Sequence, residues 1–103
     1  MNQITHITDQ AYEELATRIC ESLSQPYFFS GTIRVDCEEA SHTLTATLIF
    51  RRRRTESHKH DAEDDITSVV AVWYDSYSLC DDCSEPRIND FDIEELSRHL
   101  IGR

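Results

Sequence analysis

The sequence is short of the residues that interrupt or loosen a chain. Its 103 residues include two glycines and two prolines, too few for a long flexible linker. Two glycines also argue strongly against a glycine-rich loop that cradles a phosphate through backbone N–H groups. No apolar run approaches the ~20 residues that span a bilayer. Residues 1–6 have neither the basic nor the apolar stretch of a signal peptide. We therefore expect one cytoplasmic domain over residues 1–103, with no membrane segment.

Motifs of catalysis are missing as well. The sequence has no nucleophile elbow of the Gly-x-Ser-x-Gly type and no His-Glu-x-x-His metal motif. Carboxylates are so numerous that no acidic pair stands out as a general acid and base. We therefore predict that the protein is not an enzyme.

Negative charge is in excess and is unevenly distributed along the sequence. Twenty acidic residues against ten basic ones give a formal charge of −10. Residues 51–65 contain five of each sign, including the run Arg51 to Arg54, so the rest of the chain carries the whole net charge. An acidic surface repels polyanions, which argues against binding to nucleic acid or to an anionic membrane. The arginine run is interpreted as the end of a hairpin whose charges are matched by the acids that follow it.

Helical periodicity occurs at both ends of the sequence. Apolar residues recur at helical spacing over residues 8–25, where Thr8 is a typical N-cap and Pro26 ends the helix. A second apolar stripe runs over residues 92–101, with Asp92 at its start and Gly102 after its end. We predict a helix in each of these two segments.

The middle of the chain has the alternation of β-strands. Residues 42–50 are apolar at 44, 46, 48 and 50 and have threonine at 43, 45 and 47. Residues 28–38 alternate in part, and residues 66–79 are rich in β-branched and aromatic residues. Matching of apolar side chains predicts a register with Phe50 opposite Ile66 and Leu44 opposite Val72. The same register sets three arginines opposite three acids: Arg51 with Asp65, Arg52 with Asp64, and Arg53 with Glu63.

These elements predict a small α+β fold in the order helix, three-stranded antiparallel meander, helix (αβββα), with both helices on one face of the sheet. The uncovered face would carry an apolar patch among threonines, and a monomer seldom leaves such a patch bare. The leading hypothesis is therefore an interaction module that forms a homodimer through this face, with another protein as a further candidate partner. The predicted interface residues are Thr45, Thr47, Ile49, Val69, Ala71 and Trp73.

Two alternatives remain open. Cys80-Asp-Asp-Cys83 has the spacing of half a zinc site, and a meander brings Cys37 and His42 to the same end of the sheet. The second hypothesis is therefore a zinc-stabilised binding domain with Cys37, His42, Cys80 and Cys83 as ligands. Ordinary reduced thiols without a cofactor are the simpler interpretation. The third hypothesis is an acidic inhibitor that mimics nucleic acid, which the net charge permits.

Overall fold

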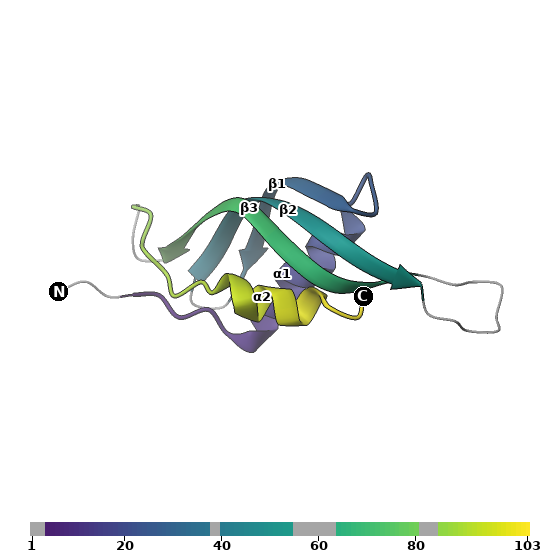
Figure 1. Cartoon of the computed structure of the whole chain (residues 1–103). Helices are drawn as coiled ribbons and strands as arrows, with labels where there is room; N and C mark the ends of the chain where they lie inside the picture. Colours follow the sequence, from purple (N-terminus) through teal and green to yellow (C-terminus); the bar gives the residue numbers. More distant parts are fainter. Residues whose placement is uncertain (1–3, 38–39, 55–63, 81–84) are drawn as a thin grey trace.

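The computed structural model describes residues 4–37, 40–54, 64–80 and 85–103 (Figure 1). Two helices flank three strands in chain order, which confirms the predicted αβββα fold. The elements are α1 (Asp9–Glu21), β1 (Phe28–Asp36), β2 (Ala40–Arg54), β3 (Asp64–Cys80) and α2 (Ile93–Leu100). No helix among these described residues is long and apolar enough to cross a membrane.

The three strands form one antiparallel sheet in the order β1-β2-β3. Both helices pack on one face of it, α1 against β1 and α2 against β3, and the two helices also contact each other (Figure 1). We call this side of the sheet the core face and the other side the open face. Alternate residues of β2 point to the core face and are almost fully buried: Leu44, Ala46, Leu48 and Phe50.

The core is continuous between the sheet and the two helices. From α1 it receives Leu15 and Ile19, and from α2 it receives Leu96 and Leu100, all nearly inaccessible to solvent. Burying each such side chain contributes about 1.5–3 kcal/mol relative to leaving it exposed. The amphipathic stripes of both helices therefore hold them to the same side of the sheet.

The first helix begins as predicted and ends earlier. Thr8 is the N-cap, and its Oγ1 accepts a hydrogen bond from the N–H of Ala11 at 3.2 Å. The helix stops at Glu21, four residues before the expected end at Gln25. The N–H of Ser22 bonds to the carbonyls of Arg18 and Ile19 and closes the last turn. Pro26 lies beyond this end, so it follows the helix without terminating it.

The predicted register between β2 and β3 is wrong. Phe50 lies opposite Val69 and Leu44 lies opposite Ser76. The register shifts twice, between Thr47 and Leu48 and between Arg51 and Arg52, so β3 contains two extra residues, Val72 and Thr67. Each such bulge reverses which face the following residues point to.

The arginine run lies opposite acids that are displaced by two residues from the expected positions. Arg53 lies opposite Asp65 and Arg54 lies opposite Asp64, whereas Arg51 and Arg52 lie opposite Ser68 and Ile66. The predicted partner Glu63 is outside the described residues. The Nε of Arg52 donates to the carbonyl of Pro26 at 2.5 Å, so this arginine ties the hairpin to the turn before β1.

The end of the chain pairs with the outer edge of β3. Ser78 and Arg87 exchange two backbone hydrogen bonds, of 2.9 and 2.7 Å. At the other end of the strand, the N–H of Gly102 donates to the carbonyl of Ile66, and the N–H of Ile66 donates to the carbonyl of Arg103. Both ends of this edge are therefore occupied, which limits pairing with another strand there.

Candidate functional site

The open face carries a row of apolar side chains that crosses all three strands. Phe28 in β1 pairs with Ile49 in β2, and Ile49 pairs with Val70 in β3. Trp73 lies in the next row, opposite Thr47. Their exposed fractions are 43% for Phe28, 42% for Ile49, 47% for Val70 and 52% for Trp73. We call these four residues the apolar patch.

Hydroxyl groups beside the apolar patch are paired with one another. The Oγ of Ser30 lies 3.0 Å from the Oγ1 of Thr47, and the Oγ1 of Thr32 lies 2.9 Å from that of Thr45. These cross-strand hydrogen bonds connect β1 to β2 on the open face. Because the hydroxyls already have partners within the sheet, covering this face would cost less desolvation than covering unpaired hydroxyls.

The structure divides the predicted interface residues between the two faces. Thr45, Thr47, Ile49 and Trp73 are on the open face. Val69 and Ala71 are partly buried and pack against the core, because the bulges in β3 turn these two side chains to the core face. Phe28 and Val70 were not among the predicted interface residues, and their exposed apolar side chains complete the row.

The predicted zinc ligands are described only in part. Cys37 is a half-buried free thiol, whose pKa is raised by burial and by the nearby charges of Glu14 and Asp36. His42 is buried, and its Nδ1 forms a 2.7 Å hydrogen bond with the Oγ of Ser78. Cys83 and the side chain of Cys80 lie outside the described residues. The zinc site therefore stays a prediction.

A different cluster of possible ligands lies where α1 meets α2. One ligand atom each from Asp9, Glu95 and His99 lies within 4.8 Å of the others. The sequence offered a weak signal: Glu95 and His99 are four residues apart and share one helix face. Nothing local in the sequence links these two residues to Asp9, so the set could not be predicted from it.

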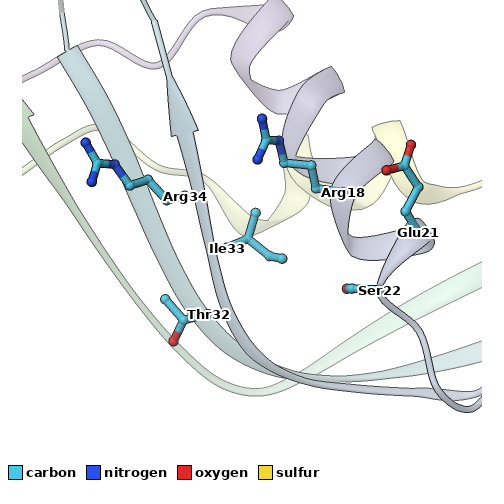
Figure 2. A pocket seen from close by; sticks show the side chains of 6 residues that line it. All are labelled: Arg18, Glu21, Ser22, Thr32, Ile33 and Arg34. Carbon is cyan, nitrogen blue, oxygen red and sulfur yellow. The ribbon is translucent and has the colours of Figure 1, made fainter.

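An open hollow of about 350 Å³ lies between the end of α1 and β1 (Figure 2). Figure 2 shows Ile33 between the side chains of Arg18 and Arg34. Each arginine has a carboxylate partner at 3.0 Å, Glu14 for Arg18 and Asp36 for Arg34. With both guanidinium groups engaged, the hollow has weak attraction for an anion, and we assign it no ligand.

Comparison with known proteins identifies no relative: no protein-family model matches the chain, and neither the curated proteins nor the solved structures include a significant match.

Proposed function

We propose that the protein is a non-enzymatic interaction module that forms a homodimer through the open face of its sheet. The observation that carries the proposal is the exposed row of Phe28, Ile49 and Val70 with Trp73 beside it. Exposed apolar side chains from three strands form one patch here, and such patches mark interaction sites on small proteins. Aromatic residues such as Trp73 are frequent anchors of binding energy in interfaces.

The charge balance of the open face permits a second copy of the chain as the partner. Two molecules that each carry −10 repel one another over most orientations. The pattern of strand pairing places basic and acidic residues on the open face in equal number: Arg34, Arg51 and Arg53 with Asp36, Asp65 and Asp75. This face therefore has no net charge among the described residues, so two copies that meet there in physiological salt face little local repulsion. A self-complementary surface of this kind suits a two-fold dimer.

Binding without catalysis agrees with the chemistry of the described thiols and of His42. Burial raises the pKa of Cys20, and it also raises the pKa of Cys37, which disfavours the nucleophilic thiolate. His42 is enclosed and hydrogen-bonded to Ser78, a structural arrangement. The free state of both thiols also favours a cytoplasmic location for the protein.

Sedimentation equilibrium tests the proposed dimer directly. The wild-type protein is expected at twice the 12.0 kDa of the chain, and Trp73→Arg should be a folded monomer. Ile88→Arg is the matched control, because Ile88 is 71% exposed and lies outside the sheet. It should remain dimeric. A monomeric wild-type protein at high micromolar concentration, or equal loss of dimer in both variants, would exclude the proposal.

A further inference from the structure

The contact between α1 and α2 gathers metal-binding groups from both helices. Asp9 lies in the first turn of α1, and Glu95 and His99 lie one turn apart on α2. One ligand atom from each lies within 4.8 Å of the others. Modest side-chain rotations would close such a triangle around a single ion, with its oxygen and nitrogen ligands at about 2.0–2.2 Å.

The ring of His99 is held in place by two neighbouring side chains. Its Nδ1–H donates to the Oε2 of Glu13 at 2.8 Å. The ring of Tyr12 lies parallel to it, with the centroids 6.0 Å apart and an interplanar angle of 7°. When the neutral ring carries its proton on Nδ1, Nε2 has a free lone pair. Metal-binding histidines commonly have this carboxylate on the opposite nitrogen.

The charges around the cluster favour a cation. Asp9 and Glu95 each add a carboxylate at the site, and Glu13 adds a third behind His99. Arg103 contacts Glu13 and Arg98 pairs with Glu95, so the three carboxylates and two guanidinium groups keep one negative charge in excess. An ion bound to Glu95 would replace the contact with Arg98, which lies at the exposed surface of α2.

We propose that Asp9, Glu95 and His99 bind one divalent transition-metal ion, with water completing its coordination shell. Two carboxylates and an imidazole suit ions such as manganese or zinc. The site joins α1 to α2 on the core face of the sheet, away from the open face. It is therefore independent of the proposed dimer, and a bound ion would stabilise the packing of the two helices.

Manganese(II) is a suitable probe, because carboxylate and imidazole ligands bind it while the thiolates of the chain compete poorly for it. In a ¹H–¹⁵N correlation spectrum, substoichiometric Mn²⁺ should broaden the amide signals around Asp9, Glu95 and His99 first. It should also raise the melting temperature. Broadening confined to other acidic segments, or no broadening at all, would overturn the proposal.

Two variants and one control distinguish a built site from general attraction to an acidic protein. Asp9→Asn removes an exposed ligand and leaves the N-cap Thr8 in place, so it should fold and lose the local broadening. Glu13→Gln should weaken Mn²⁺ binding about 10- to 100-fold by loosening His99. Glu94→Gln removes one negative charge from the exposed face of α2 and should leave binding unchanged. Equal weakening by Asp9→Asn and Glu94→Gln would overturn the proposal.

Discussion

The Nδ1 of His42 in β2 lies 2.7 Å from the Oγ of Ser78 in β3, in a hydrogen bond enclosed on the core face of the sheet. Both side chains are almost inaccessible to solvent. The same Oγ accepts a hydrogen bond from the Nδ2 of Asn89 at 2.9 Å. A short polar chain thus connects two strands to the segment that leads into α2.

The burial of His42 predicts a stability that depends on pH. Burial lowers the pKa of His42 below its ordinary value of 6.5. Below pH 6.5 the unfolded chain therefore binds more protons than the native protein, and stability falls as the pH drops towards and through the lower folded pKa. Urea unfolding between pH 7.5 and 5 should show this decline. His42→Gln should flatten it, and a wild-type protein with constant stability over this range would contradict the assignment.

Removal of the Ser78 hydroxyl should destabilise the protein more than removal of the neighbouring Ser76 hydroxyl. Ser78→Ala removes the partner of the buried Nδ1 of His42, which costs about 1–3 kcal/mol, and one of the two partners of the Nδ2 of Asn89. Ser76→Ala removes one bond to Asn89 from a half-buried position and should cost about 1 kcal/mol or less. Urea unfolding measures both free energies, and equal losses would refute a special role for Ser78.

Lysine substitutions at two adjacent positions test the shifted register of β3. Val69 packs against the core opposite Phe50, whereas Val70 lies on the open face opposite Ile49. Val69→Lys should lower the free energy of unfolding by about 2 kcal/mol or more. Val70→Lys should change it by less than about 0.5 kcal/mol in the monomer. Unfolding is measured at a protein concentration low enough to exclude dimers. The reverse order of effects would mean that the register is wrong.

The two glycines should respond differently to alanine. Gly102 has a φ of +93°, and nothing lies within 4 Å of a Cβ added there, so the cost of Gly102→Ala arises from the backbone. It should be about 1–2 kcal/mol, because the N–H of Gly102 must stay bonded to Ile66. At Gly31 an added Cβ would meet the ring of Phe29 at an ordinary 3.8 Å. Gly31→Ala should therefore lower the free energy of unfolding only slightly, as measured by thermal unfolding. An equal loss in Gly31→Ala and Gly102→Ala would argue against the positive φ of Gly102.

The elements themselves could be predicted from local patterns. Alternation in residues 42–50 identified β2 and its buried side chains, Thr8 marked the start of α1, and Gly102 marked the end of α2. Each of these features depends on the conformational preferences of a few residues that are neighbours in the chain. Alternation in β2 also placed Ile49 on the open face, whereas Trp73 was assigned to that face through a register that the structure does not have.

The pairing of β3 and the cluster around His99 were decided by tertiary structure. Residues 69–74 are apolar or aromatic at every position, so no alternation fixes which of them face the core. Bulges at Thr67 and Val72 settle that question, together with the pairing of the chain's end to Ile66 and Ser78. Asp9 and His99 meet only because α1 and α2 cover the same face of the sheet. Sequence periodicity gives the faces of each element separately, whereas register and the meeting of distant side chains depend on packing between elements far apart in the chain.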